Sequence, residues 1–327
     1  MTAKRKASEL LSEPNTSRAM VRAMAKLGRV QDDCGLLDEP DDLPEQRPTL
    51  KQPTGKVVQF PLLFSDEARP VSNAMARSAL FAAIQGKNRQ MFRDQHLATV
   101  EGVEIIFTGQ QLNQDDHDVL MQLVHMVQHK PIGDYVTLPA NVILKALGRG
   151  TSGREHEQLK ADMKRLLECL VTLRNTKSKV TYYGHLIDDA MQDEYLPQHK
   201  RHWCFRLNAK MLPFYARDSF SLIDWEQRKD LKRKDLARWL HGYYATHAKP
   251  LPVKVETLRK LSGSKAKSLR HFREKLRAAL DNLKAIGAIV SWQIDAADLV
   301  TVDRGDAITA SQRHHLTRAR PRRKRKD

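Results

Sequence analysis

Two helices expected from the apolar spacing of this chain begin with basic and hydroxyl side chains, the groups that bind DNA. In the helix predicted over residues 264–285, Phe272 and the leucines share one face, which leaves Arg270 and His271 opposite. The first turn of a helix in the major groove reaches base edges, and its unpaired amides can meet a phosphate. The helix predicted over 152–170 has the same design. The predicted DNA contacts are Arg149, Ser152, Arg154, Lys164, Arg165, Ser264, Lys265, Lys267, Ser268, Arg270 and His271.

Basic residues opposite an apolar stripe are often merely solvated, so two such helices indicate DNA binding more strongly than either helix alone. Ser152 and Glu155 predict a capping box that sets the start of the first helix. Glu157 and Glu274 also lie on the outer faces, where a carboxylate can accept a hydrogen bond from a cytosine amine. The predicted apolar stripe of the first helix consists of Leu159, Met163, Leu166 and Leu170.

Each of these helices comes third in an order of elements that occurs twice between residues 110 and 303. The first copy is predicted as a helix from 113, a strand 135–138, a helix from 139 to the glycines at 148–150, a helix 152–170 and a strand 171–175. The second is predicted as a helix 236–244, a strand 253–255, a helix 256–261, a helix 264–285 and strands 288–294 and 299–302. This is the order of a winged-helix module, a variant of the helix-turn-helix.

Further strands are expected around the first copy, at 104–107, 180–187 and 203–207, with an acidic loop over 188–195. The first wing is therefore expected to be longer than the second. We predict an α+β fold in which winged-helix domain 1 covers 74–218 and winged-helix domain 2 covers 219–306.

The composition indicates a protein that attracts polyanions, because the formal net charge is +17 and the isoelectric point is about 9.8. Residues 1–58 are poor in aromatic residues and rich in Pro and Asp, which predicts a disordered arm, and 307–327 is predicted as a disordered basic tail. Residues 59–73 form the linker between the arm and the first domain. No apolar run has the length of a membrane helix and no secretion signal is evident, so a bacterial cytoplasmic protein without membrane contact is expected.

Motifs for catalysis and for cofactor or metal binding are missing from the sequence. The G-x-G-x-x-G match at 148–153 follows a helix rather than a strand, and no G-x-x-x-x-G-K-[ST] occurs. His125 and His129 have the spacing of a zinc pair but lack the glutamate and a third ligand, and Cys34, Cys169 and Cys204 form no C-x-x-C pair. We therefore expect no enzyme activity, no cofactor and no metal.

Several short strings resemble the TrfA-type replication initiators of broad-host-range plasmids. They are Ala74-Met-Ala-Arg-Ser-Ala-Leu-Phe81, Thr108-Gly109 with Leu112, Pro131-Ile-Gly133, and the segment from Asp230-Leu231 to Lys249-Pro-Leu-Pro-Val-Lys-Val-Glu-Thr-Leu258. The resemblance covers about 59–303. It implies a protein that binds directly repeated sites (iterons) in double-stranded plasmid-origin DNA, opens a neighbouring AT-rich segment that becomes single-stranded, and recruits the host helicase, initiator and sliding clamp. It also implies a monomer–dimer equilibrium that controls plasmid copy number.

The segment Gln59-Phe-Pro-Leu-Leu-Phe64 fits Q-x-x-L-x-F, a motif by which bacterial proteins dock on the sliding clamp, and resembles the clamp-binding element at the same place in that family. Two apolar anchors can enter a pocket while the glutamine bonds at its rim. An edge strand that pins the arm to the first domain is the alternative. The predicted clamp-binding residues are Gln59, Leu62, Leu63 and Phe64.

Two other classes of function remain open at this point. A winged-helix transcriptional regulator or autorepressor would bind an operator and needs no clamp motif. A nicking replication enzyme needs a nucleophilic tyrosine beside a metal held by two histidines. Tyr182-Tyr183 and Tyr243-Tyr244 supply tyrosines, but Tyr243 and Tyr244 share the helical spacing of core residues, and His314-His315 has no intervening apolar residue.

Overall fold

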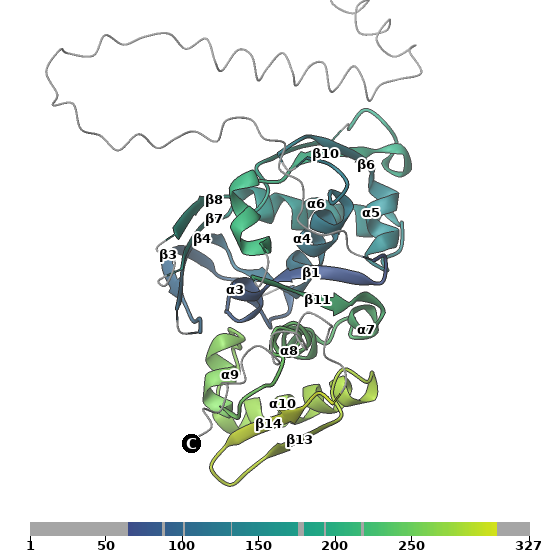
Figure 1. Cartoon of the computed structure of the whole chain (residues 1–327). Coiled ribbons are helices and arrows are strands. Elements are labelled where there is room, and N and C mark those ends of the chain that lie inside the picture. The colour runs from purple at the N-terminus through teal and green to yellow at the C-terminus, as the bar shows by residue number, and fades with distance from the viewer. Residues whose placement is uncertain are drawn as a thin grey trace, which may run out of the picture. The chain divides into compact units, whose positions relative to one another are not determined.

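The computed structural model describes residues 65–305, except 87–88, 101, 132, 176–179, 193 and 217–218. The predicted arm, the predicted tail and the residues Gln59, Leu62, Leu63 and Phe64 lie outside this part of the chain. The described residues all belong to one compact unit, in which helices and strands are mixed as predicted (Figure 1). No helix in this unit is both long enough and apolar enough to cross a membrane.

The first repeat starts with helix α4 (Gln114–Met126), whose start is set by a full capping box between Asn113 and Asp116. The apolar residues predicted at helical spacing are buried, and polar residues of the same helix are buried with them. Strand β6 (Val136–Pro139), α5 (Ala140–Ala146) and α6 (Gly153–Glu168) follow in the predicted order. Helix α5 ends at Gly148, where a φ of 65° places the backbone in the left-handed region that glycine tolerates.

The strands around the first repeat form two larger sheets and two smaller sheets of two strands each. One larger sheet has the order β6-β10-β9, with β9 at Asp189–Gln192 and β10 at His202–Arg206. The other has the order β3-β4-β7-β8 and is antiparallel throughout, with β3 at Met91–Leu97, β4 at Val103–Gln110, β7 at Leu170–Asn175 and β8 at Val180–Gly184. The remaining elements are β1 (Ala68–Ser72), α3 (Asn73–Ala76), β2 (Phe81–Ala82), β5 (Leu112–Asn113), η2 (Gln198–Lys200), η3 (Ala209–Tyr215) and β11 (Phe220–Asp224).

Two features of the first wing go beyond or correct the sequence-based expectations. The strand that follows α6 pairs with β4, a pairing that the sequence left unspecified, and the apolar residues of both strands cover the same core. Strand β9 lies inside the segment 188–195, which was predicted as a loop because it is acidic. Its backbone hydrogen bonds are made with β10, a partner that the acidic sequence does not indicate. The predicted stripe of α6 is also wrong at one position, since Leu170 lies in β7 and is 43% exposed.

The second repeat consists of α8 (Asp235–Ala245), β12 (Val253–Lys254), α9 (Val255–Leu261), α10 (Leu269–Ala285), β13 (Ser291–Ile294) and β14 (Leu299–Asp303). Helix α7 (Trp225–Asp230) precedes it. The three strands form an antiparallel sheet in the order β12-β14-β13, and α10 packs against α8 (Figure 1). The order of elements agrees with the sequence-based expectation for this repeat.

Two hydrophobic cores underlie the two repeats. The first contains the buried residues of α4, α5, α6 and the two larger sheets, and the second those of α8, α9, α10 and the β12-β14-β13 sheet. Tyr243 and Tyr244 are 4% and 2% exposed and belong to the second core, which confirms that these tyrosines are structural.

Candidate nucleic-acid interface

Helix α10 begins at Leu269, five residues later than the sequence indicates. The hydroxyl of Ser268 accepts a hydrogen bond from the backbone N–H of His271 at 3.2 Å, which makes Ser268 the N-cap. The expectation that Ser264, Lys265 and Lys267 lie within the helix is therefore wrong. They belong to the turn that enters it, next to Gly263, whose φ is 59°.

The first turn of α10 presents its basic side chains to solvent. The side chains of Arg270 and His271 are 88% and 53% exposed, and Lys267 is exposed in the preceding turn. Glu274 lies 3.6 Å from Arg270 and 3.7 Å from His271, so it contacts both groups from the next turn. The opposite face is buried at the predicted positions, which are Phe272, Leu276, Ala279, Leu280 and Leu283. Helix α10 is thus anchored on one side while its basic start faces outward.

An ion pair connects α10 to the turn between β13 and β14. Arg273 donates from Nε and Nη2 to the carboxylate of Asp298, at 2.9 and 2.5 Å. Asp298 lies in the turn between β13 and β14 and has a φ of 59°, a conformation in which aspartate is tolerated. A bidentate contact of this kind orients the turn as well as attracting it. The turn is therefore held at a defined position beside the exposed face of α10.

A groove of about 440 Å³ runs beside the turn that leads into α10. Ser264 and Lys265 line it, and Lys275 lines it from α10 itself. Arg233 and Lys234, ahead of α8, add two more cationic side chains, and Lys234 Nζ donates to Asn282 Oδ1 at 2.7 Å. The groove thus extends the basic surface sideways from the start of the helix, although Asp235 also lines it.

Helix α6 of the first repeat presents fewer cationic groups. Ser152 and Arg154 are exposed at its start, as predicted, and Lys164 is 68% exposed but lies 3.5 Å from Glu168. The predicted capping box is wrong: Ser152 occupies the N-cap position, yet its side chain makes no capping hydrogen bond. The start of α6 is therefore left with Arg154 as its exposed cation.

Arg149 and Arg165, two of the predicted DNA contacts, have guanidinium groups that form ion pairs inside the protein. Their side chains are only 9% and 10% exposed. Arg149 donates to Asp162 at 2.6 Å, and Arg165 contacts Asp162 as well as Asp116 of α4, the latter at 2.8 Å. Both carboxylates are fully buried, so these ion pairs hold α6 against α4 rather than serving an external ligand.

A second set of buried charges, at the first turn of α4, was not singled out by the sequence. Asp118 accepts hydrogen bonds from Arg228 at 2.7 Å and from Arg238 at 2.9 Å, and Arg238 also donates to Asp115 at 2.7 Å. Arg228 and Arg238 are 2% and 4% exposed. Acidic residues early in a helix and arginines in later helices are common, so the only available signal was that Asp115, Asp116 and Asp118 gather in one turn.

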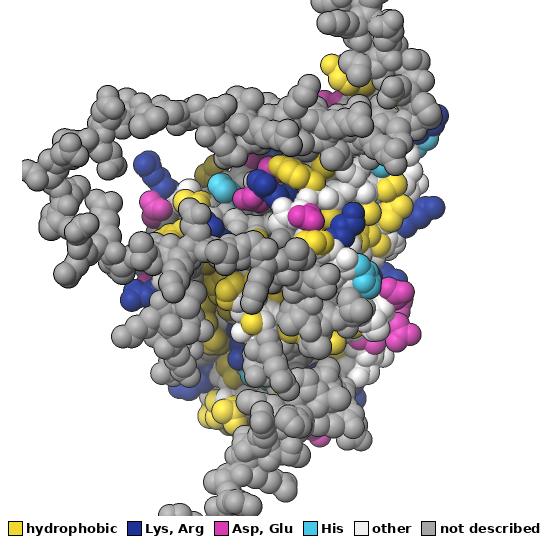
Figure 2. Space-filling view, turned by 45° about the horizontal axis from the view of Figure 1, so that its top comes forward, with side chains coloured by type: hydrophobic (Ala, Val, Ile, Leu, Met, Phe, Trp, Pro, Cys, Tyr) yellow, Lys and Arg dark blue, Asp and Glu magenta, His cyan; other side chains and the backbone are white. Residues whose placement is uncertain are grey.

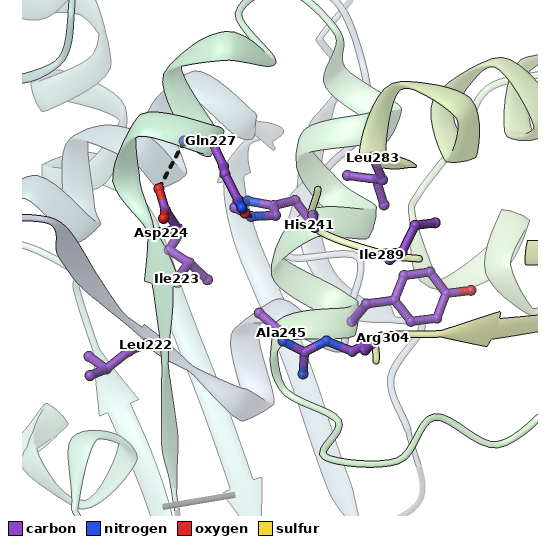
Figure 3. Close-up of a pocket in the computed structure, with 11 residues that line it drawn as sticks. Leu222, Ile223, Asp224, Gln227, His241, Ala245, Leu283, Ile289 and Arg304 are labelled. Carbon is purple, nitrogen blue, oxygen red and sulfur yellow. Dashed lines mark hydrogen bonds between the residues drawn. The ribbon is translucent and has the colours of Figure 1, made fainter. Parts of the chain in front are cut away.

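A cavity of about 250 Å³ lies between β11, α8 and the residues after α10 (Figure 3). His241 stands at its centre and contacts Gln227 at 3.3 Å, with Arg304 on the opposite side. Burial, with Arg228 and Arg304 nearby, lowers the pKa of His241 to about 3, so the ring stays neutral near pH 7. Burial also lowers the pKa of Arg304 to about 10, which leaves this group charged.

The exposed charges do not form one continuous patch on the face shown in Figure 2, where Lys and Arg side chains are interspersed with Asp and Glu over the area that grey atoms leave visible. Within the described ranges, no cluster of three or more His, Cys, Asp or Glu residues is arranged to hold a metal ion. The first turn of α10 is therefore the best defined candidate for an anion-binding surface.

Comparison with known proteins agrees with the resemblance noted in the sequence. The family model described as TrfA protein matches residues 56–304. The plasmid replication initiator protein TrfA of Escherichia coli is 26% identical over 249 residues, which are 73% of this chain and 62% of that protein. The chain thus spans less than two thirds of the length of this relative.

Two crystal structures of domains 2 and 3 of RctB are among the solved structures that are similar to this chain. Their TM-scores are 0.46 and 0.43 at 13% and 14% sequence identity. The matches cover 64% and 63% of this chain and 84% and 81% of the RctB chains. The family model spans well over half of the chain, and the chain therefore belongs to the TrfA protein family.

Proposed function

We propose that this protein is a plasmid replication initiator whose two repeats are winged-helix modules that bind directly repeated sites in the plasmid origin. The exposed basic first turn of α10 is the observation that carries this proposal, because the helix is capped, anchored and third in its repeat. Membership of the TrfA protein family and the printed name of the Escherichia coli relative support it. In this proposal α10 and α6 each enter a major groove, about 10 base pairs apart on one side of the duplex.

The proposed steps after binding need no catalytic group of this chain. The bound protein opens an adjacent AT-rich segment, binds the single strand that forms, and recruits the host helicase, initiator and sliding clamp. The segment from Gln59 to Phe64 supplies the clamp contact, and self-association adjusts the amount of binding-competent monomer. Of the tyrosine pairs that a nicking enzyme could use, Tyr243-Tyr244 is buried in the second core.

DNase I footprinting of the full chain on its own plasmid origin tests the proposal. Protection of several equally spaced direct repeats is expected, and Arg270→Ala should weaken protection of every repeat. The matched control is Lys284→Ala, which removes a cation near the other end of α10. Protection of one isolated operator, with no repeats, would identify an ordinary transcriptional regulator and refute the initiator role.

A further inference from the structure

The first turn of α4 contacts elements of both repeats through buried, charged hydrogen bonds. On one side, Asp116 accepts from Arg165 of α6 at 2.8 Å. On the other side, Asp118 accepts from Arg228 of α7 at 2.7 Å and from Arg238 of α8 at 2.9 Å. We call this set, completed by Gln114 and Asp115, the α4 joint.

The two arginines from α7 and α8 are fixed in orientation as well as in position. Arg228 also donates from Nη2 to Gln114 Oε1 at 2.8 Å and from Nη1 to the backbone carbonyl of Arg238. Arg238 reaches Asp115 at 2.7 Å and contacts Asp235 of its own helix. Every one of these contacts is directional, and most of the groups are buried, so a rotation of α8 against α4 would break several hydrogen bonds together.

The joint is mechanically connected to both candidate DNA-reading helices. Helix α6 carries Arg165 itself, and Arg149, at the turn before α6, is bound to the same helix through Asp162. Helix α8 packs directly against α10, whose first turn is the exposed basic surface (Figure 1). The turn of α4 is therefore the shared support of α6 and of the α8–α10 pair.

Apolar packing would also hold the two repeats together, but the hydrophobic effect behind it is non-directional. Buried ion pairs give little net stability compared with apolar groups of the same shape, because desolvation offsets their attraction. Buried ion pairs instead penalise every arrangement in which a buried charge is separated from its partner. The α4 joint is therefore better suited to fixing the geometry of the helices than to stabilising the fold.

We propose that the α4 joint is the positioning element that sets the spacing and rotational phase of α6 relative to α10 on DNA. Asp115, Asp118 and Arg238 are its positioning residues, and they act through the two helices rather than by touching DNA. This inference rests on the proposed function, since it requires that both helices read one duplex. Its consequence is selectivity for the distance between two half-sites, in addition to selectivity for their sequences.

The test measures binding of the full chain to the duplex that it protects and to the same duplex with two base pairs inserted between the half-sites. The half-sites are assigned from the base pairs at which Arg154→Ala and Arg270→Ala lose discrimination. Two added base pairs rotate one half-site by about 70° relative to the other, from a repeat of about 10.5 base pairs per turn. The parent should lose on the order of 30-fold in affinity, as expected when the contacts of one helix are lost.

Asp115→Asn is the variant of choice, because Asp115 is 38% exposed and bonds across the joint to Arg238. The affinity of this variant for DNA should fall less than about fivefold when the two base pairs are inserted, since a loosened joint lets both helices reach their half-sites. The matched control is Asp235→Asn. It removes a carboxylate that contacts the same arginine, Arg238, from within α8 rather than across the joint, and it should discriminate between the two duplexes as the parent does. Arg238→Lys keeps the charge but loses the fork of donors, so it should resemble Asp115→Asn.

Each outcome decides between the alternatives. Folded Asp115→Asn and Arg238→Lys variants that keep the parent's discrimination would overturn the proposal. Loss of the folded far-UV circular dichroism signal in both would overturn it as well, because the joint would then be needed for folding rather than for phase. A parent that protects repeats but ignores the insertion refutes the joint alone, whereas a parent that protects no DNA refutes the proposed function.

Discussion

Replacing His241 by glutamine should make the protein more tolerant of acid. His241 is 5% exposed, its Nδ1 has no hydrogen-bond partner, and its other nitrogen lies 3.3 Å from Gln227 (Figure 3). Burial lowers its pKa to about 3, whereas an unfolded histidine titrates near 6.5. The folded state thus holds fewer protons than the unfolded state between these two pH values, and stability falls as the pH drops below about 6.5.

The size of the effect follows from these two pKa values. At pH 7.5 both states are neutral at this position, so His241 contributes no pH dependence there. A pH of 5 lies about 1.5 units below the pKa of the unfolded histidine. Protonation of the unfolded state therefore lowers the free energy of unfolding by about 2 kcal/mol at this residue. Burial also lowers the pKa of His125 and of His247 to about 4 each, so the parent's total loss between pH 7.5 and 5 is larger.

Urea unfolding followed by circular dichroism at pH 7.5 and pH 5 measures the difference. The variant His241→Gln should lose about 2 kcal/mol less than the parent between the two pH values, whatever its stability at pH 7.5. The matched control is His271→Gln, which makes the same substitution at a half-exposed position and so separates the effect of burial from that of the substitution itself. An equal loss in His241→Gln and in the parent would refute the burial of a neutral imidazole in this cavity.

Three further predictions concern ligands. Arg270→Ala should cost about 1 to 3 kcal/mol of specific binding free energy and relax selectivity at one base pair. Lys265→Ala should instead weaken binding to all DNA sequences alike and reduce the dependence of affinity on salt concentration. Titrations on matched and mismatched duplexes at several salt concentrations distinguish the two effects. Specific affinity should fall on the order of a thousandfold between 50 and 200 mM salt, and removal of residues 313–327 should flatten this slope without changing the preferred sequence, as filter binding would show. The triple variant Gln59→Ala, Leu62→Ala, Phe64→Ala should lose sliding-clamp binding in a pull-down but keep origin affinity and thermal stability; unfolding of the variant, together with no clamp affinity in the parent, would favour a core role for this segment.

The sequence predicted helix interiors well, because burial of one face imposes a spacing that a single chain displays. Most of the buried apolar and aromatic residues of α4, α8 and α10 were anticipated on this ground, whereas the buried polar residues of α4 and α8 were not. Helix starts were predicted less well. Ser264 and Ser268 are equally good N-cap residues, and only the hydrogen bond from His271 to Ser268 determines which one begins α10.

Partners distant in sequence account for what the sequence did not show at the candidate interface. The helical projection places Arg165 outside the apolar stripe of α6, and it cannot show that the long side chain reaches Asp116, 49 residues earlier. Arg149 behaves in the same way, since Asp162 is buried and accepts from it. No prediction was made from the sequence for the pairing of β7 with β4, because strand partners depend on tertiary packing rather than on the neighbouring turn.

The two repeats are therefore unequal in what they offer to DNA, although their order of elements is the same. In the first repeat, two of the predicted cationic contacts stabilise the packing of α6 and leave Arg154 and a paired Lys164 outside. In the second repeat, the start of α10 keeps its cations exposed, and the adjoining groove adds more. Base discrimination should consequently depend more on α10, while α6 contributes mainly through the position in which the α4 joint holds it.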